Sequence, residues 1–377
     1  PLQADGVELA ILLTRRPSGA PKAVPVLVDA MEDVDGEAGD KAMRRLIEMG
    51  NEKAAARLAN SISEMEEVAD KKEAARFLLE HDAKVPTDSV KPHIEKAEDA
   101  EFKGLLWELV AASGDSSVVD ELMKKFNSTE FADRIVAVRA MGHTDSKKVV
   151  QPLSQAMFEG DPDLRRAAAE SLGQLGLPSA LDALKRALNR ERVKKVKLEV
   201  IDAIARIDSA DSVKMLRFQT TDRDPEIKKR VIAALRSLGR TEGAKALGVL
   251  LRDRDMSIQW AAFIAALELD PEEGYSRMSS ALRNPPANFM ADVNTLRSKT
   301  RHRLIRFMLE EGTEKVRGSA LTAVQQMGDE RFEIARDLVL DTSVDEGVRR
   351  TLLLELSEKK ADKDKPLFER IVRESSS

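Results

Sequence analysis

The feature that most constrains this chain is a sequence unit that recurs about every 31 residues. The segment Asp161–Gly176 has a counterpart 63 residues later, at Asp224–Gly239, and one further unit lies between them. Equivalent units begin near residues 193, 255, 316 and 348. A fixed period in the range of roughly 20–50 residues is typical of a protein built from stacked copies of one supersecondary unit.

Each unit opens with the signals of an amphipathic helix. Asp161 and Asp224 stand at N-cap positions, and a proline follows each of them at the first helical position, where a missing N–H costs nothing. Apolar residues then recur on one helical face. A second apolar helix follows, and the pair can bury its apolar face only against neighbouring pairs. Glycines are expected to end first helices in the left-handed conformation, at Gly142, Gly176, Gly239 and Gly328.

The same rhythm continues, less regularly, toward both ends of the chain. We therefore expect an all-α protein, a right-handed α-α superhelix of about a dozen helix pairs of about 31 residues. Three of the expected helices span 146–158, 190–206 and 271–283, and the two prolines within 284–288 predict a loop or a bend. We expect three regions, with degenerate acidic repeats over 1–160, regular repeats over 161–283 and C-terminal repeats over 284–377.

Composition supports helices and excludes several kinds of site. Hydrophobic residues make up 42% of the chain and aromatic residues only 4%. The hydrophobic residues are therefore mainly Ala, Leu, Val, Ile and Met, which favour helices over strands. The chain has no cysteine, which excludes disulfides, thiolate metal sites and cysteine nucleophiles. We expect the scattered Trp107 and Trp260 to lie in the core.

The compartment stays open between the cytoplasm and a bacterial cell envelope, since the absence of cysteine suits either. No run of 18 uncharged apolar residues predicts a membrane span, and no charged-then-apolar leader opens the chain. Residue 1 is proline, so we expect that preceding residues were removed or that the chain is one region of a longer protein.

The units resemble those of the HEAT-repeat superfamily, in the short bacterial form also found in phycobilin lyases. That form follows the pattern D-x-x-V-R-x-x-A-x-x-x-L-G-x-L-G. Asp161–Gly176 matches it nearly throughout, and Asp224–Gly239 matches it with Lys228 in the arginine place. The resemblance implies a helical solenoid over most of the chain. It leaves the function open, because HEAT arrays serve as scaffolds, transport receptors, lyases and a few enzymes.

No motif predicts catalysis. HEAT-type iron hydroxylases carry His-Glu pairs, but no histidine of this chain precedes a glutamate, and no two are spaced to share a helical face. The four histidines are His81, His93, His143 and His302. The chain also lacks a G-x-S-x-G elbow, a glycine-rich phosphate loop and a Walker lysine. We therefore expect no catalytic residue, no metal and no cofactor.

Charge is distributed unevenly on a chain whose formal net charge is -5. Residues 1–160 hold 21 basic and 30 acidic residues, whereas residues 185–254 hold 19 basic and 10 acidic ones. One repeat position is basic in five units, at Arg165, Lys194, Lys228, Arg317 and Arg349. We expect cations there to bond acidic residues of the preceding repeat or loop carbonyls, which is a structural role.

The remaining cations of the basic segments are the predicted partner-binding residues. They are Arg192, Lys195, Lys197, Lys229, Arg230, Arg297, Lys299, Arg301, Arg303 and Arg306. They predict a non-catalytic scaffold or adaptor whose partners are proteins with acidic surfaces. Two alternatives stay open: a lyase or chaperone-lyase acting on a protein-bound cofactor, and binding to the phosphates of nucleic acid or lipid. Few aromatic residues and a negative net charge disfavour nucleic acid.

Overall fold

The computed structural model describes residues 4–15, 20–33, 36–276, 281–282, 285–359 and 364–375. Within these ranges every regular element is a helix, and none is a β-strand, which confirms the predicted all-α repeat fold. None of the described helices combines the length and apolar character that a membrane-spanning helix requires. The chain divides into two compact units, Pro1–Ile207 and Asp208–Ser377, hereafter unit 1 and unit 2. The three regions expected from sequence remain a prediction.

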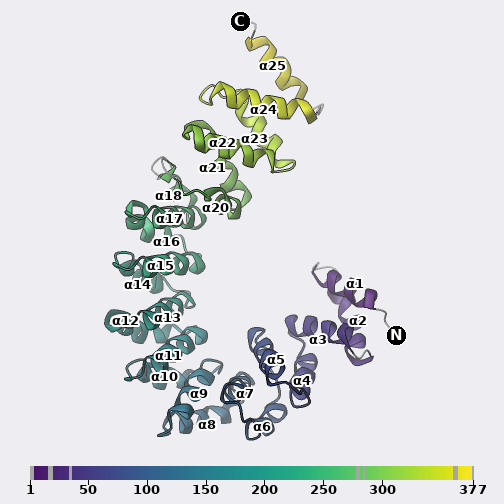
Figure 1. The fold of residues 1–377 in the computed structure, drawn as a ribbon, viewed down its shortest axis with the longest axis vertical. Helices are drawn as coiled ribbons and strands as arrows, with labels where there is room; N and C mark the ends of the chain where they lie inside the picture. Colours follow the sequence, from purple (N-terminus) through teal and green to yellow (C-terminus); the bar gives the residue numbers. More distant parts are fainter. Residues whose placement is uncertain are drawn as a thin grey trace. The chain divides into compact units, whose positions relative to one another are not determined.

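The described part of unit 1 forms six helix pairs and the first helix of a seventh (Figure 1). Its helices are α1 (Ala4–Thr14), α2 (Ala20–Asp33), α3 (Glu37–Glu48), α4 (Glu52–Ser61), α5 (Val68–Glu80), α6 (Thr87–Ile94), α7 (Ala100–Ala112), α8 (Ser116–Phe126), α9 (Phe131–Met141), α10 (Val150–Ala156), α11 (Pro162–Leu175), α12 (Leu181–Arg190) and α13 (Lys194–Ala205). Short 3₁₀ turns, η1 (Lys147–Val149) and η2 (Pro178–Ala180), precede α10 and α12. The helix expected over 146–158 therefore begins as a 3₁₀ turn.

Unit 2 continues the same alternation of helices. Its helices are α14 (Ala210–Gln219), α15 (Pro225–Leu238), α16 (Glu242–Ala246), α17 (Met256–Leu269), α18 (Pro271–Tyr275), α20 (Phe289–Thr295), α21 (Ser298–Glu311), α22 (Glu314–Gln325), α23 (Glu330–Leu338), α24 (Glu346–Lys359) and α25 (Lys365–Ser375), with η3 (Leu247–Arg252) extending α16. Of the helix expected over 271–283, α18 occupies only the first five residues, and 277–280 and 283–284 lie outside the described ranges. The adjacent prolines 285 and 286 lie in the connection to α20.

The core of unit 1 lies between two rows of helices. The first helices pack on one another in order, α5 on α7, α7 on α9, α9 on α11 and α11 on α13, with the second helices on the other side of this row (Figure 1). Both rows contribute fully buried side chains at intervals of 31 residues. They are Val110, Met141 and Leu172 from first helices and Leu122, Leu153 and Leu184 from second helices. Each repeat thus completes the core of the next. The expected burial of Trp107 and Trp260 is confirmed.

Glycines serve two different purposes at the ends of first helices. Gly176 and Gly239, with φ angles of 63° and 64°, are left-handed C-caps as predicted. Gly328 also has a left-handed φ of 54°, but it lies two residues beyond Gln326, the C-cap of α22. The prediction is wrong for Gly142, whose φ is -64°. Glycine is needed there because α11 approaches closely: a Cβ atom on Gly142 would lie 2.8 Å from the Cα atom of Ser171. Gly173, one repeat later, is equally close to a neighbouring helix.

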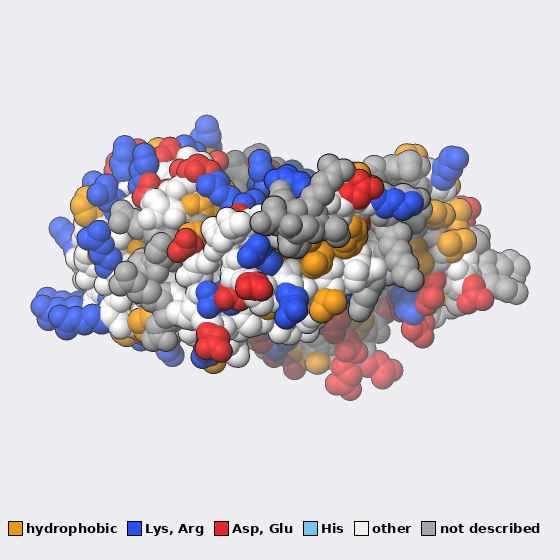
Figure 2. Space-filling view, turned by 90° about the horizontal axis from the view of Figure 1, so that it is seen from above, with side chains coloured by type: hydrophobic (Ala, Val, Ile, Leu, Met, Phe, Trp, Pro, Cys, Tyr) orange, Lys and Arg blue, Asp and Glu red, His pale blue; other side chains and the backbone are white. Residues whose placement is uncertain are grey.

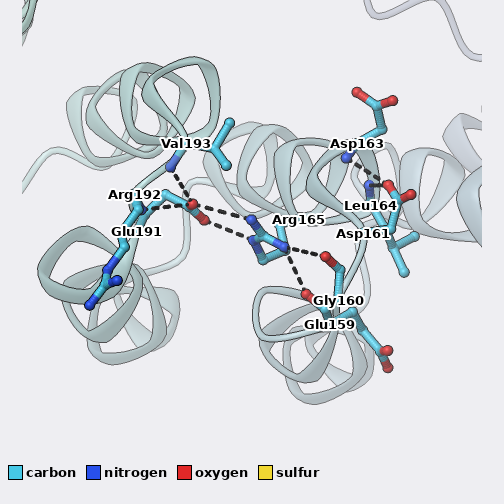
Figure 3. Close-up of polar contacts among 9 residues, drawn as sticks. All are labelled: Glu159, Gly160, Asp161, Asp163, Leu164, Arg165, Glu191, Arg192 and Val193. Carbon is cyan, nitrogen blue, oxygen red and sulfur yellow. Dashed lines mark hydrogen bonds and ion pairs between the residues drawn. The ribbon is translucent and has the colours of Figure 1, made fainter.

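Arg165 connects two successive repeats near the start of α11 (Figure 3). Its Nε and Nη2 atoms donate to the Glu191 carboxylate at 2.8 and 3.2 Å. Its Nη1 atom donates to the backbone carbonyls of Glu159 and Gly160 at 2.9 and 2.8 Å. One guanidinium therefore holds the connection that precedes α11 and the connection that leads into α13.

Glu191 also organises its own connection. Its Oε1 atom accepts the backbone N–H groups of Arg192 and Val193 at 2.9 and 2.8 Å. Burial acts to raise the pKa of Glu191, but the hydrogen bonds from Arg165 and the Val193 N–H outweigh it and lower that pKa. These bonds keep residues 191–193 extended, so α13 begins at Lys194 and not at residue 190 as expected.

The cation position of Arg165, Lys194, Lys228, Arg317 and Arg349 extends to Lys103 and Arg134 in the preceding first helices. Two of the other cations form ion pairs equivalent to that of Arg165. Arg134 pairs with Glu159 at 2.9 Å, and Lys228 pairs with Asp253 at 2.6 Å. At Arg165 and Lys228 the expected acidic partner in the preceding repeat is thus wrong, since each acid lies in the connection that leads into the next repeat. That connection passes over the first turn of the helix that bears the cation. The expected bond to a loop carbonyl is confirmed at Arg165 and at Arg349, which donates to the Val344 carbonyl at 3.1 Å.

Replacement of Arg165 by Met is expected to lower the free energy of unfolding by about 3 kcal/mol, because a buried carboxylate and two carbonyls lose their donor. The control is Lys84→Met. Lys84 pairs with Asp145 at 3.2 Å, and both side chains are more than half exposed, so the expected loss is below about 0.5 kcal/mol. Urea unfolding followed by circular dichroism measures both variants. Equal losses would contradict the structural role of Arg165.

Gly173→Ala is expected to destabilise unit 1 by about 1–3 kcal/mol, because overpacking forces backbones apart. A Cβ atom there would lie 2.6 Å from the Cα atom of Ala203 on α13. Gly160→Ala is the matched control, since no atom lies within 4 Å of its Cβ position, and its effect should stay within about 0.5 kcal/mol. Thermal unfolding compares the two variants. An unchanged midpoint for Gly173→Ala would show that the contact between α11 and α13 tolerates a methyl group.

Candidate binding groove on the first helices of unit 1

A groove of about 480 Å³ crosses the first helices α7, α9 and α11 on the side away from the second helices. Its floor includes Leu105 from α7 and the half-buried Ile135 and Val136 from α9. A second cavity of about 470 Å³ adjoins it and shares His143 and Gln174 with it. The groove is therefore open along the row of first helices and is not confined to one repeat.

Charged groups line this groove at one repeated position. Glu108, Arg139 and Glu170 each lie five residues after the cation position of their helix, and Glu199 holds the same place on α13. Because these helices pack side by side, the four residues form a row, hereafter the groove position. Glu101 also lines the groove, but it already pairs with Lys72 and Arg76 from α5.

Glu108 is the most perturbed group of the groove. Burial raises its pKa to about 7, the positive charge of Arg139 opposes that rise, and the negative charge of Glu170 adds to it. Its carboxylate accepts no hydrogen bond within the described part of the chain, and the nearest base is His143 Nε2 at 3.7 Å. Burial lowers the pKa of His143, so the imidazole is neutral at pH 7 and does not neutralise Glu108.

The neighbouring carboxylates are also weakly paired. Burial and the charge of Glu170 raise the pKa of Glu199, whose ion pair with Arg206 spans 3.7 Å. Glu170 itself faces Arg166 at 4.0 Å. Among the described residues no three His, Cys, Asp or Glu side chains converge so as to hold a metal ion. The arrangement suits a ligand that carries positive charge on a partly apolar body.

The structure places the predicted partner-binding residues in two different settings. Arg192 and Lys195 are exposed at the start of α13, and Lys195 lies four residues before Glu199, on the same helical face. Lys197 is half-buried on α13, and Lys229 and Arg230 are exposed on α15 in unit 2. Arg192, Lys195 and Lys229 form no ion pair with any residue that the structure describes. Their role in binding remains a prediction.

The cluster 297–306 is largely occupied by contacts within unit 2. Arg301 pairs with Glu330 at 2.7 Å. Arg303 pairs with Glu272 at 2.6 Å and lies over the Tyr275 ring at 3.8 Å. Arg306 pairs with Glu310 at 2.6 Å and Asp341 at 3.0 Å. Only Arg297 and Lys299 of this cluster are exposed without an ion pair among the described residues. These contacts reduce the positive charge that the cluster offers to a partner.

Charges of both signs are interspersed on the molecular surface. On the face shown in Figure 2, Lys and Arg side chains lie among Asp and Glu side chains, and blue atoms gather mainly at the left edge of the view. The basic runs of the sequence do not indicate the groove position. A signal existed, since Glu108, Arg139 and Glu170 follow one another at intervals of 31 residues. Charge alone could not show that the first of them is buried.

Glu108→Gln is expected to stabilise the protein more at pH 8 than at pH 5. The folded-state pKa of about 7 exceeds the ordinary value of 4.5, so stability from Glu108 protonation is lost as the pH rises through 7. The difference between the two pH values should be about 2 kcal/mol. Urea unfolding at pH 5 and pH 8 tests this, with the exposed Glu130→Gln as the control. A stabilisation that does not change with pH would contradict burial of an ionisable Glu108.

The match to a family model agrees with the repeat fold. Residues 119–205 match the model of HEAT repeats, whereas no curated protein sequence matches the chain. A similar solved structure is an engineered protein with 19% identity, a TM-score of 0.35 and coverage of 96% of this chain and 97% of that one.

Two natural proteins are also similar. A chain from the complex of CpcE and CpcF of phycocyanin lyase from Nostoc sp. PCC7120 has 14% identity and a TM-score of 0.35, with 64% of this chain and 94% of that one covered. A chain from the Kap95p–RanGDP complex has 12% identity and a TM-score of 0.45, with 98% and 61% covered. The family match runs from within α8 to the end of α13. Residues 119–205 are therefore identified as HEAT repeats.

Proposed function

We propose that this chain is a non-catalytic scaffold or adaptor that binds one or more proteins. The observation that supports this most strongly is the row of first helices in unit 1. It presents a long exposed face in which charged groups recur once per repeat. Stacked repeats offer extended surfaces of this kind, suited to macromolecular partners.

The proposed contact residues at the start of α13 are Arg192 and Lys195. Both are exposed and carry no ion pair among the described residues, so a partner's carboxylates can reach them without breaking internal bonds. Lysine and arginine side chains in such settings steer association with acidic protein surfaces. Lys229 in unit 2 and the pair Arg297 and Lys299 are further candidates for the same reason.

The other two functions receive less support. Neither cavity on the first helices is lined by a described Phe, Tyr or Trp side chain, and two further cavities hold one phenylalanine each, Phe102 and Phe158. A tetrapyrrole or a nucleobase gains much of its binding energy by stacking on such rings. Arg301, Arg303 and Arg306 already pair with carboxylates of unit 2. Their charge is therefore less available to a phosphate backbone.

The test is affinity capture from a lysate of the source organism, followed by mass spectrometry. Arg192→Glu/Lys195→Glu is expected to reduce capture of a stoichiometric protein at least tenfold, because two attractive contacts become repulsive. The control is Lys124→Glu/Lys185→Glu, which reverses two exposed lysines on the second helices α8 and α12.

Equal capture by both double variants would contradict the proposed contact surface. Capture of nucleic acid in place of a protein would favour phosphate binding. A bound chromophore in the purified protein, detected by its visible absorption, would favour the lyase alternative.

A further inference from the structure

We propose that the groove over α7, α9 and α11 binds a lysine or arginine side chain of a protein partner, with the cationic head against Glu108 and the aliphatic stem on Ile135 and Val136. This inference rests on the proposed function, since the cation belongs to a protein. It adds a second kind of contact. Arg192 and Lys195 would bind acidic groups of the partner, whereas the groove would bind a basic one.

The shape of the groove fits such an occupant. About 480 Å³ of open space accommodates a few side chains and the segment of backbone that carries them. The half-buried floor residues Ile135 and Val136 offer an apolar surface next to a carboxylate. Long basic side chains use both features at once, because their methylene stems pack on apolar atoms while the charged head stays among polar ones.

The charge of the groove fits as well. Glu108 is largely buried, with 14% of its side chain exposed. Among the described residues, only His143 lies within ion-pair distance of its carboxylate, and that imidazole is neutral. Glu101 on the same helix shows the contrasting case, since Lys72 and Arg76 already neutralise it. A carboxylate that has lost water without gaining a partner costs free energy, and a bound cation recovers that cost.

The groups that face Glu108 come from each helix packed around it. Arg76 projects from α5, Arg139 from α9 and Glu170 from α11, and each acts on Glu108 through space. His143, after α9, is neutral near pH 7 because burial lowers its pKa. The two arginines lie beyond 4.0 Å from the carboxylate, so neither occupies the place that a ligand cation would take. A metal ion is a poorer candidate, because the described donors do not converge around one point.

Binding should depend on pH. A cation pairs with the ionised form of Glu108, and ionisation of that group spreads over pH 6 to pH 8 because its pKa is about 7. The affinity for a cation should therefore rise as the pH rises. With one group controlling the site, affinity should be about tenfold greater at pH 8 than at pH 6.

The experiment uses the full chain and a minimal probe. N-acetyl-lysine methylamide is titrated into protein with labelled Ile δ1 methyl groups, and the NMR shift of the Ile135 methyl group is followed. The Nε-acetylated analogue has nearly the same stem and no charge, so it serves as the ligand control. We expect saturable binding of the charged probe, and at least tenfold weaker binding of the neutral one.

Two variants test the residue assignment. Glu108→Gln should weaken the charged probe about tenfold at pH 8 and remove the pH dependence, since an amide neither ionises nor pairs with an ammonium. Glu130→Gln, at an exposed glutamate outside the groove, should change neither. A spectrum dispersed as in the wild type establishes that each variant is folded.

The experiments test the groove assignment and the scaffold function separately. No saturable shift at Ile135, equal binding of both probes, or binding by Glu108→Gln equal to the wild type would overturn the groove assignment. Protein capture that still depends on Arg192 and Lys195 would then leave the scaffold function standing. Conversely, probe binding without any captured protein would retain the groove site and reject the proposed function.

Discussion

The structure depends on one constraint, which is that a pair of short amphipathic helices cannot bury its apolar face alone. Met141 and Leu172 reach full burial because the repeats on both sides cover them. Neighbouring backbones must then approach closely, as the contact of Gly173 with Ala203 shows. Stability in such an array comes from interfaces between adjacent repeats. Side chains on the outer face of the first helices do not contribute to this packing, so their charge and polarity can vary.

Two positions on the same helix illustrate this division. The cation position lies in the first turn, where Arg165 holds two connections and could not be lost without exposing buried acceptors. Five residues later, on the groove side, the same helix carries Glu170, which makes only a long ion pair with Arg166. Repeat position therefore separates charges that maintain the solenoid from charges that face outward. The proposed partner contacts all belong to the second class.

Several features of the chain could be anticipated from its residues. The N-caps at Asp161 and Asp224, the left-handed caps at Gly176 and Gly239 and the burial of Trp260 all follow from rules that act within a few residues. Gly142 departs from the left-handed cap because a close approach of two helices requires glycine as strictly as a left-handed turn does. The basic cluster 297–306 could not be divided from sequence, because the partners of its arginines lie about one repeat away.

By itself the sequence determined the period, the boundaries of most helices and the identity of the buried face, because caps and hydrophobic spacing act locally. Only the tertiary structure decided which charges are neutralised. Glu191 lies next to basic residues in the sequence, and Glu108 has a basic residue at the equivalent position of the next repeat. One nevertheless receives a bidentate guanidinium from a residue 26 positions away, while the other is buried without an ion pair to Lys or Arg. Stacking of repeats sets those environments, and it lies beyond the reach of local sequence rules.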